Sequence, residues 1–360
     1  MRRRRGGSAQ VPLFAAQVMP GLEEVAWDEI KQRLVGALRL ASVEELVLFR
    51  WLEDPSTLLE LRTTEDVFAI VDFSQEMGPA YRHLRAYAQK LYRCRAWEAV
   101  VGLHHRMCQG KVKRTTCRVV TQMRGRHGFR RVDAQRAVEG VVAARFPRWK
   151  WVSDHAHLEV WVHLQPGFAM TSVRLSDRTM RHRRYKVAHL PASLRPTLAA
   201  AMVFLSQPRP SDRFCDPMCG AGTILIERAM TERFAGLWGG DRDPGAISVA
   251  RANIGPRHQP LALHHWDASR LPLLDASLDR LVTNLPFGKQ MGSVEENQRL
   301  YHGFFQEMGR VLRDGGKAIL LTNQHDLIRQ QLAVHPALRK VREVSVRILG
   351  QPARIYVLAH

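Results

Sequence analysis

Apolar and polar residues alternate along the first 75 residues as short strands and helices require. The apolar run at 11–18 predicts a strand, and apolar positions recurring every three or four residues over 21–34 predict an amphipathic helix. Further strands are expected at residues 47–52, 58–63 and 67–73. Mixed strand and helix in so short a stretch indicate a small α+β domain.

The next segment, residues 76–165, combines apolar runs with dense basic charge. We expect a helix over 133–145 and a closing hairpin over 149–162. Strand aromatics usually pack inward, so we favour core positions for Trp149, Trp151 and Trp161 over a role as platforms on which bases stack. Two groups of cations lie on either side of the apolar run at 119–120: Lys111, Lys113, Arg114 and Arg118 precede it, and Arg124, Arg126, His127, Arg130 and Arg131 cluster around a glycine-containing turn after it. Such clustering suits contact with phosphates.

A connector is expected over residues 166–197. It contains Pro166-Gly167 and a cationic stretch at 178–186. This stretch suits either an RNA path, which we favour, or a solvated charged surface. A helix over 197–205 then opens the last domain.

Strand and helix alternate in the C-terminal part, the pattern of an open parallel sheet. A strand at 213–216 ends in Asp216, and Gly220 and Gly222 precede a helix over 223–230. Glycines at a helix N-terminus let the backbone approach a ligand closely. The third glycine of the dinucleotide fingerprint is absent, so the two glycines alone specify no ligand.

Two more acids follow strands of the same sheet. Asp241 ends a strand about twenty residues after the first glycine, where a carboxylate can accept hydrogen bonds from both hydroxyls of a ribose. Asp243, which precedes Pro244, is instead expected to cap a helix. Asp267 follows a third short strand and is placed for an adenine amino group. Acids at successive strand ends favour a ligand site over isolated loop acids.

The fourth strand, 279–284, runs into Asn284-Leu285-Pro286-Phe287. This tetrapeptide suits the transfer of a methyl group to an amine. The exocyclic amine of guanine, for example, is a poor nucleophile because its lone pair is delocalised into the ring. The Asn284 side-chain oxygen and the Leu285 carbonyl can each accept one of its N–H groups and aim the lone pair at a sulfonium methyl. Pro286 stiffens the turn, and Phe287 can stack on a base swung out of its helix. The alternative is a turn after a buried strand, with Phe287 in the core.

The remaining pattern completes the sheet. An amphipathic helix at 300–312 precedes a strand at 317–322, and a hairpin of 344–349 and 354–358 closes a seven-stranded sheet.

The composition indicates which class of partner the protein binds. The 360 residues are 45% hydrophobic, enough for several cores, and carry 54 Lys and Arg against 34 Asp and Glu, a net charge of +20. That excess favours nucleic acid over a membrane surface as the partner. A generally basic proteome is the alternative.

The cysteines and the N-terminus point to a reducing compartment. Five irregularly spaced cysteines without a CxxC pair predict no metal site and no disulfide framework. No run is long enough to span a bilayer, and no apolar stretch suits a secretory signal. Residues 1–10, with Arg2–Arg5, are expected to form a disordered basic arm. A cytoplasmic location follows as the default.

Four stretches resemble one family, the THUMP-domain tRNA guanine-N2-methyltransferases. The stronger motifs are Asp216-Pro-Met-Cys-Gly-Ala-Gly-Thr223 and Asn284-Leu-Pro-Phe-Gly-Lys289. Residues 61–68 are similar to its ferredoxin-like segment, and 190–201 to the stretch that joins its RNA-binding and catalytic halves. The resemblance is loose over 76–165.

This resemblance implies an α/β chain whose C-terminal Rossmann-like methyltransferase sheet follows an α+β ferredoxin-like segment and a THUMP domain. The implied divisions are 11–75 ferredoxin-like, 76–165 THUMP, 166–197 linker and 198–360 methyltransferase. S-adenosyl-L-methionine is the implied cofactor, with S-adenosyl-L-homocysteine as product. The implied partner is tRNA, methylated at the sixth nucleotide of the acceptor stem. No DNA or membrane partner is expected, and the chain is expected to be a monomer, with a partner protein left open.

The resemblance also implies site residues. The implied catalytic residues are Asn284, Leu285, Pro286 and Phe287. The implied cofactor-binding residues are Asp216, Pro217, Cys219, Gly220, Gly222, Thr223, Asp241, Arg242, Asp267, Ala268 and Asn284. Leu285 stands where many amino-methyltransferases have proline, and only its backbone carbonyl is needed there.

Three other functions fit parts of the sequence. The same chemistry on rRNA or small nuclear RNA fits equally well, because phosphate contacts and shape select the RNA. A catalytically inactive RNA-binding protein would not need Asp216, Asp241, Asp267 and Asn284 intact. A DNA adenine methyltransferase ranks third, since it would not need a THUMP-like half.

Overall fold

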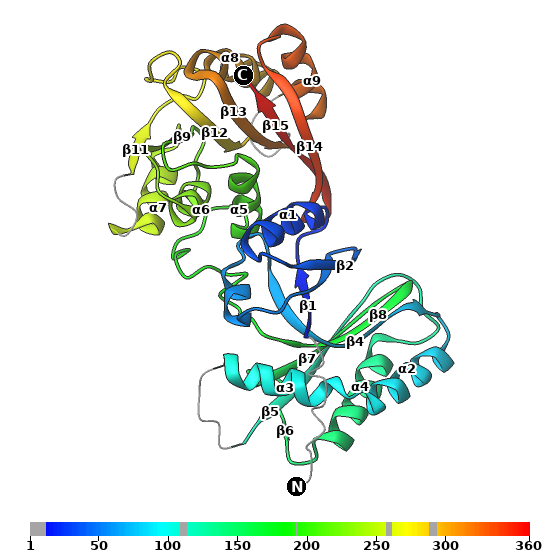
Figure 1. Cartoon of the computed structure of the whole chain (residues 1–360). Helices are drawn as coiled ribbons and strands as arrows, with labels where there is room; N and C mark the ends of the chain where they lie inside the picture. Colours follow the sequence, from blue (N-terminus) through cyan, green and yellow to red (C-terminus); the bar gives the residue numbers. More distant parts are fainter. Residues whose placement is uncertain (1–11, 109–113, 192, 257–260, 288–293) are drawn as a thin grey trace. The chain divides into compact units, whose positions relative to one another are not determined.

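The computed structural model describes residues 12–108, 114–191, 193–256, 261–287 and 294–360. The expected basic arm at 1–10 lies outside these ranges, as do Lys111, Lys113, Gly288 and Lys289. The chain divides into two compact units (Figure 1). Of the described residues, those within 12–17, 30–61 and 66–178 form unit 1, and those within 18–29, 62–65 and 179–360 form unit 2.

Unit 1 is built on an eight-stranded sheet of order β2-β3-β1-β4-β8-β7-β5-β6 (Figure 1). Its strands are β1 (Leu13–Gln17), β2 (Leu38–Val43), β3 (Leu46–Arg50), β4 (Asp66–Met77), β5 (Thr116–Met123), β6 (Lys150–Trp151), β7 (Leu158–Gln165) and β8 (Gly167–Arg174). Its helices include the 3₁₀ helix η1 (Pro55–Glu60), α2 (Tyr81–Arg93), α3 (Ala96–Met107) and α4 (Arg131–Arg145). The three α-helices contact β4, β5 or β8, so they cover the sheet.

The strand expected at 58–63 is wrong, because the chain there begins with the helical turn η1. Asp54 caps the turn: its Oδ1 accepts a hydrogen bond from the Ser56 amide at 3.0 Å. Pro55 follows at the first helical position, where its missing N–H costs nothing. This cap outweighs the apolar pattern of the following residues.

The hairpin expected at 149–162 is also wrong. β6 and β7 do not pair with each other; each pairs in parallel with β5, on opposite sides of it. Trp161, on the central strand β7, is buried as expected. Trp151, on the edge strand β6, is 40% exposed, which contradicts its expected core position. Trp149 is half-buried and stacks on Phe146, with ring centroids 4.0 Å apart.

The linker expected at 166–197 begins too early. β7 ends at Gln165, and its antiparallel partner β8 begins at Gly167, which has φ +77°. Pro166-Gly167 is therefore the turn of a hairpin. β4 runs through the expected boundary at 75/76, and one sheet takes strands from both sides of it. The assignment of 11–75 and 76–165 as ferredoxin-like and THUMP domains remains a prediction.

Unit 2 contains the expected seven-stranded sheet, of order β11-β10-β9-β12-β13-β15-β14. Its strands are β9 (Arg213–Asp216), β10 (Gly236–Asp241), β11 (Ala262–His265), β12 (Leu278–Asn284), β13 (Leu312–Thr322), β14 (Arg339–Ile348) and β15 (Gln351–Ala359). Its helices are α5 (Pro196–Leu205), α6 (Thr223–Thr231), α7 (Pro244–Ile254), α8 (Val294–Val311) and α9 (His325–Val334). β9 to β13 are parallel and β15 is antiparallel, which confirms the α/β class.

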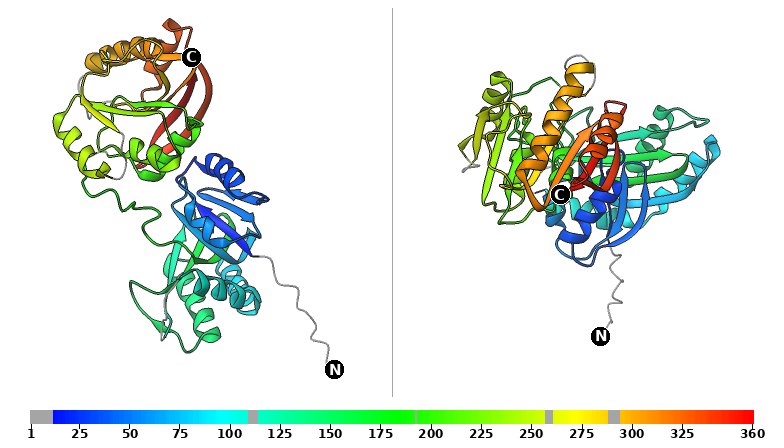
Figure 2. Two further views of the ribbon diagram at one scale, coloured as in Figure 1. Left: turned by 60° about the vertical axis from the view of Figure 1, so that its left-hand side comes forward. Right: turned by 90° about the horizontal axis from the view of Figure 1, so that it is seen from above.

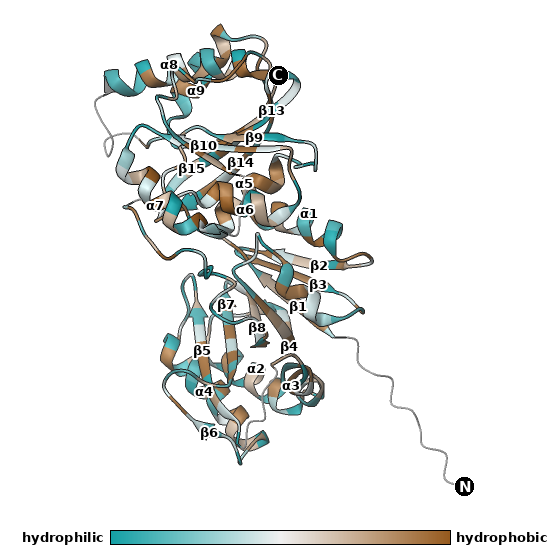
Figure 3. Ribbon diagram, turned by 90° about the vertical axis from the view of Figure 1, so that its left-hand side faces the viewer, coloured by the Kyte–Doolittle hydropathy of each residue, from teal (hydrophilic) through white to brown (hydrophobic). Residues whose placement is uncertain are grey.

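Both faces of this sheet are buried, and alternate strand residues supply the two cores. Phe214 and Val282 join α5 in one core, whereas Cys215 and Leu281 join α8 in the other. Figure 2 shows the green α5 and the orange α8 on opposite faces of the sheet. α5 is apolar along its whole length, brown in Figure 3, and almost completely buried. None of the described helices combines the length and apolarity that crossing a membrane requires.

A segment from the start of the chain completes one of these cores. Helix α1 (Glu23–Arg33) begins within the 18–29 segment of unit 2, and Leu22, Val25 and Ala26 are fully buried with the core that contains α5. Gly21 has φ +91°, and a Cβ there would lie 1.9 Å from the Ser345 carbonyl oxygen. Only glycine fits at this contact.

Candidate active site

The predicted site residues gather at the carboxyl edge of the unit 2 sheet. Asp216, Asp241 and Asn284 end β9, β10 and β12, which are parallel neighbours. The chain order reverses between β9 and β12, the switch point at which open α/β sheets bind their ligands. The structure thus brings together residues from three separate stretches of sequence.

Hydrogen bonds tie the glycine turn after β9 to the end of β10. The Gly220 amide donates to Asp241 Oδ2 at 2.9 Å, and the Cys219 amide donates to the Gly240 carbonyl at 2.8 Å. Asp241 Oδ1 accepts from the Asp243 amide at 3.0 Å. Each oxygen of Asp241 keeps a lone pair for a further donor, because a carboxylate offers about four acceptor positions.

Gly220 and Gly222 both require left-handed backbone. Their φ angles are +48° and +76°, and Gly222 precedes the first residue of α6. A Cβ on Gly222 would lie 3.2 Å from the Ala250 Cβ, so this glycine lets α6 and α7 approach. A Cβ on Gly220 would meet no described atom within 4 Å, so its surface faces open space. That open side suits close approach of a ligand to the backbone.

Trp266 braces the same turn, a role that the sequence did not reveal. Its indole Nε1 donates to the Pro217 carbonyl at 3.0 Å. A Cβ on Gly240 would lie 2.0 Å from the indole ring, which explains the glycine at that point of β10. The sequence offered one indication of this contact: a bulky aromatic directly follows β11, and the neighbouring strand β10 contains a glycine.

Asp216 lies beneath the turn and is almost completely buried. Its Oδ1 accepts from the Met218 amide at 3.3 Å. Burial raises the pKa of Asp216 to about 7, and the nearby charge of Asp241 adds to the rise. The protonation of this carboxyl near pH 7 is therefore sensitive to a positive charge placed nearby, which would lower its pKa.

The remaining predicted cofactor residues surround this turn and the end of β11. Thr223 and Cys219 are buried, as is Ala268. Asp267 is exposed, and its Oδ1 accepts from the Ser269 amide at 2.9 Å. Arg242 is exposed, and its carbonyl accepts from His265 Nε2 at 2.9 Å.

The helix cap predicted at Asp243 is confirmed. Its Oδ1 accepts from the Gly245 amide at 2.8 Å, and Pro244 occupies the first helical position of α7. Asp243 therefore serves the start of α7, whereas Asp241 is bonded to the glycine turn through the Gly220 amide. This position, beside the open side of Gly220, is the one expected for a ligand-facing acid.

Asn284 has a buried polar atom without a described partner. Its side-chain Oδ1 accepts no hydrogen bond from any described residue. Leaving such an acceptor without a donor costs about 1–3 kcal/mol, so this oxygen is available to a donor supplied by a ligand or by water. The next residue, Leu285, is fully buried and its amide donates to the Leu321 carbonyl at 3.0 Å, which fixes the turn to β13.

Tyr301 supports this turn from α8, although the sequence indicated only a core position for it. Its hydroxyl donates to the Pro286 carbonyl at 3.4 Å and lies 2.7 Å from Thr322 Oγ1. Phe287 is half-buried and packs against the core that contains α5. Part of its ring therefore belongs to the core, as the alternative interpretation held, and part remains accessible.

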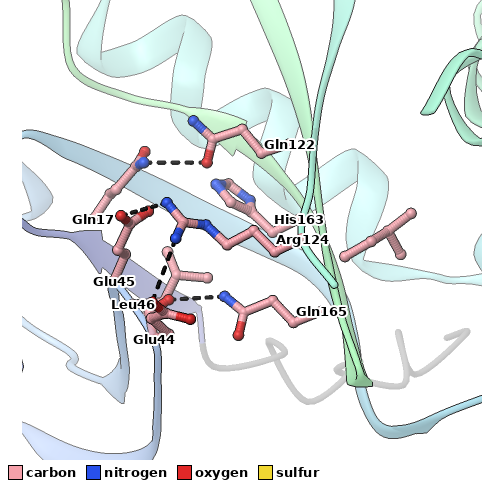
Figure 4. Close-up of a pocket in the computed structure, with 9 residues that line it drawn as sticks. Gln17, Glu44, Glu45, Leu46, Gln122, Arg124, His163 and Gln165 are labelled. Atoms are coloured by element: carbon pink, nitrogen blue, oxygen red, sulfur yellow. Dashed lines mark hydrogen bonds and ion pairs between the residues drawn. The ribbon is translucent and has the colours of Figure 1, made fainter. Parts of the chain in front are cut away.

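A small polar pocket in unit 1 is a different kind of feature (Figure 4). Arg124 forms ion pairs with Glu44 and Glu45, and Gln17 donates to Gln122 at 3.2 Å. Burial and the charge of Arg124 lower the pKa of His163 to about 3, so its ring is neutral. Because its charged groups pair with one another, this pocket is no candidate for a charged ligand.

The sheet order and the site at its switch point define the class of Rossmann-like methyltransferases. Residues 183–353 match the family described as RMKL-like, methyltransferase domain. The chain is 31% identical over 243 residues to the tRNA (guanine(6)-N2)-methyltransferase of Thermus thermophilus, covering 67% of this chain and 71% of the relative. The chain belongs to the family that contains this enzyme.

Two further comparisons define the extent of the likeness. The crystal structure of TrmN from Thermus thermophilus has a TM-score of 0.77 at 24% identity, covering 97% of this chain and 99% of that one, which confirms the fold. The mouse tRNA (guanine(6)-N(2))-methyltransferase THUMP3 is 35% identical over 248 residues, covering 65% of this chain and 49% of the relative. The chain thus spans about half the length of such mammalian relatives.

Proposed function

We propose that this protein transfers a methyl group from S-adenosyl-L-methionine to the exocyclic N2 of a guanosine in tRNA. The products are N2-methylguanosine and S-adenosyl-L-homocysteine, and the proposed target is the sixth nucleotide of the acceptor stem. The unsatisfied Oδ1 of Asn284 carries this proposal, because it is an acceptor held in place without a donor. The names of the relatives support the substrate.

The turn between β9 and α6 and the end of β10 are the proposed cofactor site. The open side of Gly220 admits the ligand to the backbone, and Asp241 keeps acceptor capacity for the ribose hydroxyls. Asp267 would accept from the adenine amine. Asp216, Pro217, Cys219, Gly222, Thr223, Arg242 and Ala268 complete the proposed set. When bound, the cofactor supplies an electrophilic methyl on a sulfonium.

The acceptor amine would be oriented by two oxygens. Asn284 Oδ1 would accept one N–H of the guanine amine, and the Leu285 carbonyl the other. These two residues would direct the nitrogen lone pair toward the methyl group that the cofactor supplies, and the extra proton would be lost afterwards to solvent or a nearby carbonyl. Phe287 would stack on the flipped base with the accessible part of its ring. Positioning and electrostatics thus suffice, without a strong base.

The RNA partner is proposed from charge as well as from the relatives. A net charge of +20 supports binding of a polyanion. In unit 1, Arg126, Arg130 and Arg131 are exposed around the turn before α4. We propose that this basic surface, in the segment assigned to the THUMP domain, contacts tRNA phosphates.

Methyl transfer from labelled S-adenosyl-L-methionine to unmodified tRNA, rRNA and DNA, followed by nucleoside mass spectrometry, tests the proposal. We expect N2-methylguanosine in tRNA only. A transcript with adenosine in place of the sixth guanosine is the matched control and should stay unlabelled. N2-methylguanosine in rRNA alone would support the proposed reaction but assign it to another structured RNA instead of tRNA. Label in DNA, or in no nucleic acid, would overturn the proposal.

A further inference from the structure

Three histidines of unit 1 converge although they are distant in sequence. His104 and His105 lie in the last turn of α3, and His157 lies directly before β7. One potential ligand atom of each lies within 4.8 Å of the others. The ring centroids of His104 and His157 are 5.3 Å apart, with the rings nearly perpendicular.

Two nitrogens of this cluster have no hydrogen-bond partner. His104 is 2% exposed, and its Nδ1 and the Nδ1 of His157 are buried without a partner among the described residues. Cys108 Sγ lies 3.4 Å from His104 Nε2, so this thiol takes the other ring nitrogen. An imidazole nitrogen buried without a partner is costly, and a metal ion is one of the few groups that satisfies several at once.

We propose that His104, His105 and His157 bind one divalent transition-metal ion of the zinc class. Three imidazoles with an open fourth position are an established zinc ligand set. The ion would tie the end of α3 to the start of β7, because the ligands come from those two elements. The sequence predicted no metal because it lacks a CxxC pair, but three imidazoles from distant segments need no such motif.

The test uses the full chain without a polyhistidine tag, stripped of metal and titrated with Co²⁺ and then Zn²⁺. We expect one equivalent of Co²⁺ with the visible absorption of a tetrahedral site, displaced by Zn²⁺. His105→Gln and His157→Gln should each weaken binding at least about tenfold. His155→Asn is the matched control, since His155 lies in the same loop with an 84% exposed side chain and should leave binding unchanged.

A melting curve with and without Zn²⁺ is the second measurement. Zn²⁺ should raise the Tm of the wild type and of His155→Asn, but not that of His105→Gln. His105 is exposed, so its replacement is expected to fold, which circular dichroism of the metal-free variant checks. Absence of stoichiometric metal in the wild type, or equal affinity in the folded His105→Gln and His157→Gln variants, would overturn the proposal.

Discussion

The hydroxyl of Tyr301 donates a hydrogen bond to the carbonyl oxygen of Pro286 at 3.4 Å. The same hydroxyl lies 2.7 Å from Thr322 Oγ1, at the end of β13. Through this hydroxyl, helix α8 and strand β13 therefore support the Asn284–Phe287 turn. Tyr301 is fully buried and contacts the turn through the Pro286 carbonyl, so we expect it to act as a positioning residue.

Tyr301→Phe should lower turnover more than it lowers cofactor affinity. The variant removes only the hydroxyl, so we expect a stability loss of about 1 kcal/mol and a turn that is less well held. Single-turnover methyl transfer and cofactor titration separate the two effects. Thr322→Val is the control, because it leaves the bond to Pro286 in place. Equal kinetic defects in both variants would assign the effect to general packing.

Asn284→Ala should abolish methyl transfer while leaving cofactor affinity within about twofold. The variant removes the buried acceptor proposed to orient the amine, and loss of one such group costs about 100-fold or more in turnover. Asn284→Asp keeps an acceptor oxygen and should retain more activity than alanine. Calorimetry with S-adenosyl-L-homocysteine measures the affinity. Parallel loss of affinity and turnover would contradict the role assigned to Asn284.

Asp241→Ala should chiefly weaken cofactor binding, because the carboxylate both holds the Gly220 amide and faces the proposed ribose. Asp243→Ala removes only the cap of α7, at a cost of about 1 kcal/mol in stability. We therefore expect its cofactor affinity to change little. Measuring both dissociation constants side by side decides between the acids. A larger effect at Asp243 would reverse the assignment.

Gly220→Ala should weaken cofactor binding more than its effect on folding explains. Gly315→Ala is a matched control in the same unit: Gly315 has φ +73°, and a Cβ there also meets no described atom within 4 Å. Both variants strain the backbone by about 1 kcal/mol. Only the methyl on Gly220 would occupy the proposed cofactor space. Thermal melting and ligand titration of the pair measure the two terms separately.

Asp216 should make stability depend on pH. Its pKa is about 7 in the folded protein and about 4 when unfolded, so the native state binds the extra proton between these values. This contribution is fully present below pH 4 and is lost as the pH rises through 7. Asp216→Asn lacks this titration, so its Tm relative to wild type should rise between pH 5 and 8. A constant difference across that range would contradict the raised pKa.

Much of the site was predictable because its signals are local. A strand that ends in an acid, a pair of glycines before a helix, and Asp243-Pro244 each reflect preferences of a few adjacent residues. Parallel strands then bring their carboxyl ends to one edge, so Asp216, Asp241 and Asn284 were expected to meet. Their roles toward cofactor and substrate remain predictions.

Features that depend on distant partners were not predictable. The pairing of β5 with both β6 and β7 follows no sequence order, so the expected hairpin failed. The support that Tyr301 gives to Pro286 and the packing of Trp266 against Gly240 depend on side chains from other elements. Apolar periodicity marks such residues as core and does not say what their polar atoms bind.

The burial of residues 18–29 in unit 2 has a consequence for biosynthesis. Leu22, Val25 and Ala26 are synthesised long before Val344 and Val346 of the same core. This apolar face therefore lacks part of its packing while the intervening residues are made. During that interval a chaperone or a premature contact can compete for a surface that a distant segment of the same chain later covers.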